Sequence, residues 1–262
     1  MLEIYQELIN VISKRERAVL ATVVSSHGSA PRKAGAKMLI KNDGTFIGTV
    51  GGGGVEQQVR ERAIEVMNSG QPKMVHFDLS GSGEGAAMIC GGQMDVFLES
   101  IVPVETLYLF GAGHIAQRTA AMGKMLGFRV VVIDPRPEYN NSDRFPDADS
   151  LIVEGYDSAF SKLNVDKDSY IVIYTTGHVL DEQCLRFAVG TKAKYIGMIG
   201  SKKKVMEVKE HLVQKGVSQQ QLDRVYAPIG IEIGAETPQE IAISILAEII
   251  KAKRIGGKSH EI

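Results

Sequence analysis

A run of four glycines in the first third of the chain has the composition of an anion-binding turn. Gly51, Gly52, Gly53 and Gly54 stand between an expected strand and an expected helix. Consecutive glycines are costly in chain entropy. We therefore expect their backbone N–H groups to approach a ligand closely, helped by the field of the helix N-terminus. Glu56 either orients a donor of that ligand or simply begins the helix. No Gly-Lys-Ser/Thr follows, so the run is not a P-loop.

An irregular segment upstream, residues 25–35, offers hydroxyl and cationic groups. It contains Ser29 and Arg32 and is rich in Gly, Ser and Pro. An arginine can hold a phosphate or carboxylate with two parallel hydrogen bonds. The segment is either a second part of the anion site or a solvated connector.

Cys90 precedes two glycines and an expected strand. Flanking glycines leave a thiol sterically open, so its thiolate is a candidate ligand for a soft metal or a sulfur species. The alternative is a buried small apolar residue. Cys184 lies in an apolar helical stripe, and we expect it in a core.

The pattern Gly111-x-Gly113-x-x-Ala116 follows an apolar strand, and Asp134 ends the next strand about twenty residues later. This spacing is typical of a dinucleotide-binding βαβ unit, with glycines near the phosphates and the acid near a ribose hydroxyl. His114 and Arg136 are adjacent to these positions, and Arg136 contacts either a phosphate or a surface acid. The fold alone does not establish that a nucleotide binds.

Two further segments end expected strands on the same edge. His178 is a candidate acid–base or ligand residue, or else a polar loop residue. Gly200 and Ser201 precede an expected helix and have the composition of an anion-binding turn.

The elements that must position these residues form two domains of an α/β protein. Residues 1–102 predict a smaller α+β domain, beginning with a helix over 2–13 in which Ile4, Leu8, Ile9 and Ile12 have helical spacing. Residues 103–262 predict a Rossmann-like domain with a parallel sheet. Its strands are expected at 107–110, 129–133, 150–153, 170–175 and 194–199, with helices near 114–126, 179–190, 201–215 and after 237.

Composition excludes several classes of protein. The 262 residues are 44% hydrophobic and 23% charged, with a net charge of −1, so no broad nucleic-acid or membrane surface is expected. No apolar run is long enough to span a bilayer. The first residues lack the pattern of a signal peptide. With two cysteines only, a reducing compartment is indicated, and we expect a cytoplasmic protein.

Taken together, these segments resemble the XdhC/CoxI family, the accessory factors of xanthine dehydrogenase and related molybdenum hydroxylases. The resemblance runs in order through nearly the whole chain, and its most specific part is the last. It is carried by residues 27–36, 51–56, 90–92, 110–114, 134–136, 195–201 and 227–242.

The resemblance implies a cofactor chaperone more than a conventional enzyme. Such a protein binds molybdenum cofactor (molybdopterin), protects it during sulfuration and delivers it to an apo molybdenum hydroxylase. A cysteine desulfurase and a second copy of the chain are the other implied partners. The resemblance also makes Cys90 the implied ligand of the metal or its sulfido group. Many members carry Cys where this chain has Gly54, and His where it has Thr176, so paired-thiol and paired-histidine sites are not expected.

Two other functions stay open on the residues alone. An NAD(P)-dependent oxidoreductase would use the βαβ unit with His178 as the acid, but would leave the four glycines and Cys90 without a task. A regulatory protein would sense a nucleotide through the second domain. For the oxidoreductase, the nucleotide bound by the second domain is NAD(P). For the cofactor chaperone, the second domain could instead hold a cytidine nucleotide attached to the pterin.

Overall fold

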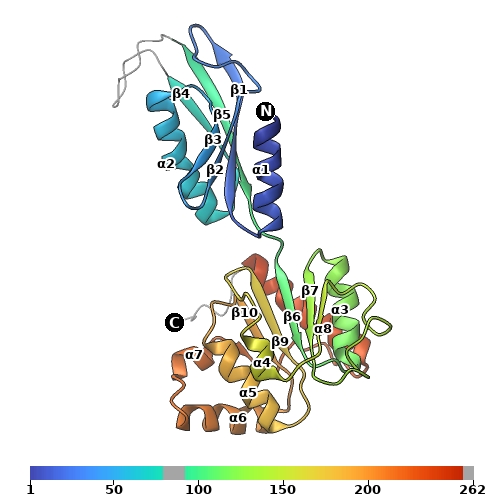
Figure 1. Cartoon of the computed structure of the whole chain (residues 1–262). Coiled ribbons are helices and arrows are strands. Elements are labelled where there is room, and N and C mark those ends of the chain that lie inside the picture. The colour runs from blue at the N-terminus through green and yellow to red at the C-terminus, as the bar shows by residue number, and fades with distance from the viewer. Residues whose placement is uncertain (79–91, 256–262) are drawn as a thin grey trace. The chain divides into compact units, whose positions relative to one another are not determined.

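The computed structural model describes residues 1–78 and 92–255 (Figure 1). The chain divides into two compact units, unit 1 (Met1–Pro103) and unit 2 (Val104–Ile262). Among the described residues, no helix has the length and apolar character needed to cross a membrane. Cys90 lies outside the described residues.

In its described residues, unit 1 is a five-stranded antiparallel sheet with one helix on each face. The strand order is β3-β2-β1-β5-β4. The elements are α1 (Leu2–Ser13), β1 (Ala18–His27), β2 (Lys37–Lys41), β3 (Phe46–Gly48), α2 (Gly53–Ser69), β4 (Lys73–Asp78) and β5 (Gln93–Ile101).

Alternation along the strands separates the two faces of this sheet. Val19, Ala21 and Val23 of β1 face α2, which contributes Val55 and Val59 to the same buried cluster. Residues of the opposite parity, such as Ala18 and Leu20, pack with Ile4 and Val11 of α1. The sheet therefore holds the start of α2 in a fixed position beside the ends of β1 and β3.

Unit 2 is a six-stranded, fully parallel sheet with the order β11-β10-β9-β6-β7-β8. In chain order this is the 3-2-1-4-5-6 arrangement of a Rossmann fold, with its switch point between β6 and β9. Its strands are β6 (Thr106–Phe110), β7 (Arg129–Ile133), β8 (Ser150–Ile152), β9 (Ser169–Ile173), β10 (Tyr195–Met198) and β11 (Val225–Tyr226). Its helices are α3 (His114–Met125), α4 (Tyr156–Phe160), α5 (His178–Val189), α6 (Lys202–Gln214), α7 (Gln219–Asp223) and α8 (Pro238–Ile255).

Helices cover both faces of this parallel sheet (Figure 1). One buried cluster joins α4, α5 and α6 to the sheet, and the other joins α3 and α8 to it. Every residue of β6 and β9 is buried, as expected for central parallel strands. The predicted α/β class with a Rossmann-like second part is confirmed.

Several details differ from the sequence expectations. Helix α2 begins at Gly53, so two of the four glycines are helical and not part of a loop. In α1, Ile4 is buried, but Ile9 and Ile12 remain 65% and 51% exposed. The short elements α4, α7 and β11 were not predicted, because elements of two to five residues carry no periodicity.

Candidate functional site

The glycine turn of unit 1 is shaped by a threonine and a glutamate. Gly51 and Gly52 have φ values of 155° and 75°, in the left-handed region that favours glycine. The Glu56 carboxylate accepts hydrogen bonds from the Gly52 N–H, at 3.0 Å, and from the Thr49 hydroxyl. Thr49 Oγ1 in turn accepts from the Gly51 N–H at 3.3 Å. Glu56 thus holds the turn from within, and sequence reasoning did not identify Thr49 as its partner.

The irregular segment with Ser29 and Arg32 lies against this turn. A Cβ placed on Gly51 would come within 2.8 Å of Cγ of Pro31, so the turn and the segment are in close contact. A Cβ on Gly92 would lie 2.6 Å from the His27 carbonyl oxygen and 2.9 Å from the Ala30 nitrogen. The segment is therefore packed between the glycine turn and the start of β5.

This arrangement leaves donors and cations available to an anion. The N-cap residue of α2, Gly52, makes no side-chain cap hydrogen bond, and within residues 1–78 and 92–255 no side chain bonds the N–H groups of Gly53 and Gly54. Arg32 and Ser29 are exposed. A helix N-terminus and a nearby guanidinium both favour a phosphate or carboxylate. The negative charge of Glu56 disfavours an anion in the same place. The hydrogen bonds that its carboxylate accepts from the turn offset part of this repulsion.

The predicted thiol ligand, Cys90, lies two residues before Gly92 in the sequence and outside the described residues. Within the described ranges, no group of three or more His, Cys, Asp or Glu side chains is placed to hold a metal ion. The prediction of Cys90 as a metal ligand stays a prediction. Cys184 is fully buried, as expected, and burial raises the pKa of its thiol, which keeps it protonated.

A second cluster in unit 1 was not found from the sequence. Asp95 of β5 accepts a hydrogen bond from the Ser25 hydroxyl at 2.5 Å, and its other oxygen lies 2.8 Å from Nδ1 of His76 on β4. These two bonds hold the pKa of Asp95 below its usual range. Only the strand register, which places His76 beside Asp95, brings the three residues together.

In unit 2, the predicted phosphate loop lies at the switch point of the sheet. Gly111 has a φ of 106°, and a Cβ there would lie 2.8 Å from the Tyr174 carbonyl oxygen. Gly113 precedes α3, whose first turn has no side-chain cap, and His114 is its exposed first residue. The loops after β6 and β9 are therefore in contact where a Rossmann fold binds its ligand.

Asp134, expected near a ribose hydroxyl, is fully buried and engaged within the protein. Its oxygens accept from the Ala112 N–H at 2.9 Å and from Nε and Nη2 of Arg136 at 2.9 and 2.7 Å. Burial alone would raise the pKa of Asp134, but these bonds hold it below its usual value. The Arg136 guanidinium also lies over the Tyr139 ring, 4.3 Å from its centroid. In this structure the pair is a structural one.

A buried charged network joins the loop after β9 to two helices. Asp181 of α5 is fully buried, accepts a hydrogen bond from the buried Thr175 hydroxyl and forms an ion pair with Lys204 of α6. Asp181 stands in an otherwise apolar helical stripe, and that was the signal available for finding it. Ser201 begins α6 as its N-cap, accepting from the Lys204 N–H at 3.3 Å.

The remaining predicted residues of this edge are close to that network. A Cβ on Gly200 would lie 3.2 Å from Cδ of Lys204, so the lysine stem covers Gly200. His178 is the exposed first residue of α5, and its Nδ1 lies 3.8 Å from a Glu207 oxygen. His178 and Ser201 are both exposed, and the Ser201 hydroxyl is already used as a helix cap.

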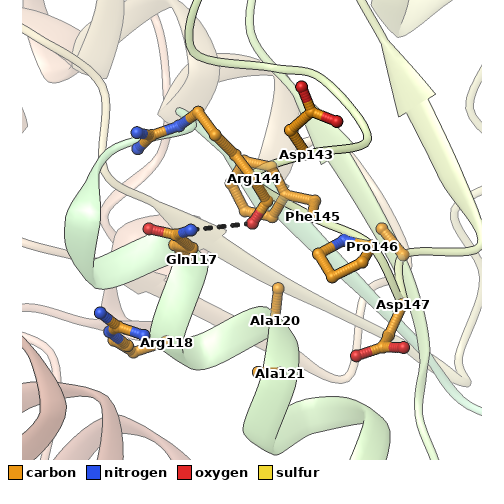
Figure 2. A pocket seen from close by; sticks show the side chains of 10 residues that line it. Gln117, Arg118, Ala120, Ala121, Asp143, Arg144, Phe145, Pro146 and Asp147 are labelled. Carbon is orange, nitrogen blue, oxygen red and sulfur yellow. Dashed lines mark hydrogen bonds between the residues drawn. The ribbon is translucent and has the colours of Figure 1, made fainter.

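A small cavity of about 210 Å³ lies beside α3, separate from the glycines of the phosphate loop. Figure 2 shows it between α3 and the segment that leads into β8, with the Gln117 amide donating to the Arg144 carbonyl oxygen at 3.0 Å. Arg144 also reaches the Ala112 carbonyl, at 3.3 Å, so the cavity wall is tied to the phosphate loop. Its lining residues are Gln117, Arg118, Ala120, Ala121, Asp143, Arg144, Phe145, Pro146, Asp147 and Ala148.

Comparison with protein families gives two matches in chain order. Residues 11–78 match the XdhC and CoxI family, and residues 107–249 match the XdhC Rossmann domain. The first match covers the glycine turn and the segment packed on it. The second covers all six strands of the parallel sheet except Thr106, the first residue of β6.

Three similar proteins extend these matches. The protein YqeB of Escherichia coli is 36% identical over 89% of this chain, and the chain spans 43% of its length. The molybdenum cofactor insertion chaperone PaoD of Escherichia coli is 24% identical over 94% of the chain and 86% of its own length. A crystal structure named as a xanthine dehydrogenase from Bacillus halodurans is 26% identical, with a TM-score of 0.52 over 98% of this chain and 97% of its own.

Proposed function

Because this chain belongs to the XdhC and CoxI family, we propose that it is an accessory factor for a molybdenum hydroxylase of the xanthine dehydrogenase type. It binds molybdenum cofactor, protects it during sulfuration and delivers it to the apo-hydroxylase. Residues 1–102 form the cofactor-handling domain, and residues 103–262 form a nucleotide-binding-type domain. The protein acts as a chaperone for a bound group more than as a conventional enzyme.

The observation that carries this proposal is the close packing of two predicted binding segments in unit 1. Pro31 lies against Gly51, and Gly92 lies against the backbone at Ala30. An oxidoreductase that relied on unit 2 alone would not require an uncapped, glycine-rich helix start in a separate unit. The names of two relatives, a molybdenum cofactor insertion chaperone and a xanthine dehydrogenase, support the same function.

The residues of unit 1 fit the anionic part of such a cofactor. The pterin of molybdenum cofactor carries a phosphate, and the uncapped first turn of α2 at Gly53 and Gly54 supplies N–H donors for its oxygens. Arg32 supplies a guanidinium, and Ser29 a hydroxyl. Glu56 keeps the turn in the conformation that exposes these donors. When bound, the group supplies the molybdenum centre on which the hydroxylase depends, and Cys90 is the proposed thiolate toward that metal.

The proposal includes three protein partners: the apo-hydroxylase, a cysteine desulfurase and a second copy of this chain. It is tested by reconstituting an apo-hydroxylase with molybdenum cofactor in the presence and absence of the protein. We expect faster and more complete recovery of hydroxylase activity when the protein is present, and slower loss of cofactor from solution. Equal recovery with and without it would contradict the proposal.

A second candidate function, nucleotide binding by unit 2, is favoured by the 3-2-1-4-5-6 strand order and by the glycines at the switch point. The engagement of Asp134 by Arg136 disfavours ribose binding at that carboxylate. Titration with NADH and with a cytidine nucleotide, followed by fluorescence or calorimetry, tests this candidate. Tight NADH binding together with hydride transfer would favour the NAD(P)-dependent oxidoreductase instead.

A further inference from the structure

Two arginines of unit 2 lie beside the same aromatic ring, at the carboxyl end of β7. Cζ of Arg136 lies 4.3 Å from the centroid of the Tyr139 ring, and Cζ of Arg144 lies 5.5 Å from the same centroid. A guanidinium in this position is attracted by the charge distribution of the ring. Arg136 follows β7, and Arg144 belongs to the segment between β7 and β8 (Figure 2). Tyr139 thus brings two cations together at one edge of the parallel sheet.

Both arginines are also tied to the phosphate loop that precedes α3. Nη2 of Arg144 donates to the Ala112 carbonyl oxygen at 3.3 Å. Arg136 is joined to the loop through Asp134, whose carboxylate accepts from the Ala112 N–H at 2.9 Å. In a Rossmann fold this loop holds the pyrophosphate of a dinucleotide, and the end of the second strand, here β7, lies beside the adenosine ribose. The arginine pair therefore lies where the ribose of such a ligand is expected.

The carboxylate that would select an unmodified ribose is already occupied. In a unit that prefers NAD, the acid at this position accepts a hydrogen bond from the ribose 2′-hydroxyl, and its charge repels a 2′-phosphate. Asp134 is fully buried and accepts from the Ala112 N–H and from the Arg136 guanidinium. The ion pair with Arg136 offsets the negative charge of Asp134. Both reasons for preferring an unmodified ribose are therefore removed.

Each guanidinium keeps N–H donors that the protein does not use. Arg136 bonds to Asp134 through Nε and Nη2, and Arg144 bonds to two backbone carbonyl oxygens through the same pair of nitrogens. Among the residues that the structure describes, no acceptor is bonded to Nη1 of either arginine. Both side chains remain partly exposed. A phosphate monoester can therefore accept hydrogen bonds from both guanidiniums without displacing a contact within the protein.

The charge at this position favours an anion. The two guanidiniums face one buried carboxylate, that of Asp134, which leaves a net positive charge. Glu138 and Asp143 are the exposed acids next to the pair in the sequence. Figure 2 shows the Asp143 carboxylate directed away from the Arg144 guanidinium. The nearby N-terminus of α3 adds to the positive field.

We propose that unit 2 binds NADP or NADPH in preference to NAD or NADH, and that Arg136 and Arg144 hold the phosphate on the 2′-oxygen of the adenosine ribose. This inference rests on the second candidate function, nucleotide binding by unit 2, and names the class of nucleotide. An acid in the position of Asp134 is typical of units that bind NAD, so the structure reverses the expectation based on spacing alone. The inference concerns binding and assigns no reaction to the nucleotide.

The test is calorimetric titration of the full chain with NADPH and with NADH, which differ only in the 2′-phosphate. We expect a Kd for NADPH that is lower by about tenfold or more, because NADH lacks the charge-assisted hydrogen bonds to the arginines. Arg144→Ala should remove most of this difference. Arg144→Lys keeps the charge but not the planar fork, and should keep part of it. Arg129→Ala, at the other end of β7, is the matched control and should keep all of it.

Competition against NADPH gives a second measurement that needs no variant. Adenosine 2′,5′-bisphosphate should displace NADPH more strongly than its 3′,5′ isomer, the fragment found in coenzyme A. Stronger displacement by the 3′,5′ isomer would overturn the proposal, because the arginines would then hold a different phosphate.

The outcomes separate this inference from the functions proposed above. Equal Kd values for NADPH and NADH would overturn the preference and leave nucleotide binding by unit 2 in place. Binding of neither would overturn both. A preference that a folded Arg144→Ala retains in full would also overturn the proposal, and circular dichroism checks the folding. The molybdenum cofactor proposal for unit 1 does not depend on any of these results.

Discussion

Replacing Arg136 by alanine tests whether the pair it forms with Asp134 is structural. The Asp134 carboxylate is fully buried, while the Arg136 side chain is 36% exposed. The change removes both side-chain hydrogen bonds from the guanidinium and, among the described residues, leaves the backbone N–H groups of Ala112 and of residue 136 as donors to the carboxylate. The buried Asp134 carboxylate thereby loses the Arg136 cation with which it pairs.

The expected loss is about 3 kcal/mol in the free energy of unfolding of unit 2. Breaking a fully buried ion pair costs roughly 3–5 kcal/mol, and solvent access to the guanidinium places this case at the lower end. For a unit of this size, such a loss lowers Tm by roughly 6–12 °C. A surface arginine without this partner contributes within about 0.5 kcal/mol, so Arg118→Ala on α3 is the control.

The loss should depend on pH in a defined direction. In the wild type the pKa of Asp134 lies below its usual value despite burial, so its contribution to stability is present above about pH 4 and is lost as the pH falls through the folded-state pKa. Without Arg136, burial dominates and raises that pKa, so protonation relieves the penalty in mild acid. The difference between wild type and Arg136→Ala should be largest near neutral pH and should shrink toward pH 4.

The assay is urea unfolding of the full chain followed by circular dichroism, since the chain has no tryptophan. Hydrogen exchange of the β6 and β7 amides identifies the transition of unit 2. Adding Asp134→Asn to Arg136→Ala should recover part of the loss. A variant within about 0.5 kcal/mol of wild type, or a loss that is the same at pH 4 and pH 7, would show that the Asp134–Arg136 pair does not stabilise unit 2.

Three further substitutions test the two predicted loops and the thiol. Gly51→Ala should destabilise unit 1 by about 1–3 kcal/mol, because φ is 155° and the new Cβ would meet Pro31; thermal unfolding by circular dichroism measures this. Gly111→Ala should destabilise unit 2 similarly through the contact with the Tyr174 carbonyl, and an unchanged Tm would contradict that. Cys90→Ser should leave folding unchanged and reduce transfer of sulfurated cofactor in reconstitution; wild-type transfer would make the thiol dispensable.

Much of the fold is predictable because its elements have strong periodic patterns. The apolar strands around Gly111 and Asp134 and the alternation of strand and helix specify the parallel sheet. The Asn-Asp-Gly turn at residues 42–44 predicts the hairpin of β2 and β3, which the structure has. The apolar spacing predicts that this helix begins at Val55, but α2 begins at Gly53, where Glu56 bonds back to the turn through a contact that composition does not encode.

The parts of the site that were missed depend on side chains brought together by tertiary structure. The bond from Thr175 to Asp181 and the ion pair of Asp181 with Lys204 join three elements. The partner of Asp134 was unexpected for a different reason: the spacing that indicates a ribose-binding acid is the same whether the acid faces a ligand or pairs with Arg136. Sequence spacing locates the acid in the fold, but it does not say whether a ligand or a protein side chain donates hydrogen bonds to its carboxylate.

Identifying what the protein binds in a cell shows whether unit 1 holds a molybdenum cofactor. The full chain is purified from a host supplied with molybdate, and its molybdenum and small molecules are measured by elemental analysis and mass spectrometry. We predict a molybdopterin and molybdenum close to one per chain, both strongly reduced in Arg32→Ala. A protein free of pterin and molybdenum, or one that carries only a nucleotide, would show that unit 1 is not a molybdenum cofactor site.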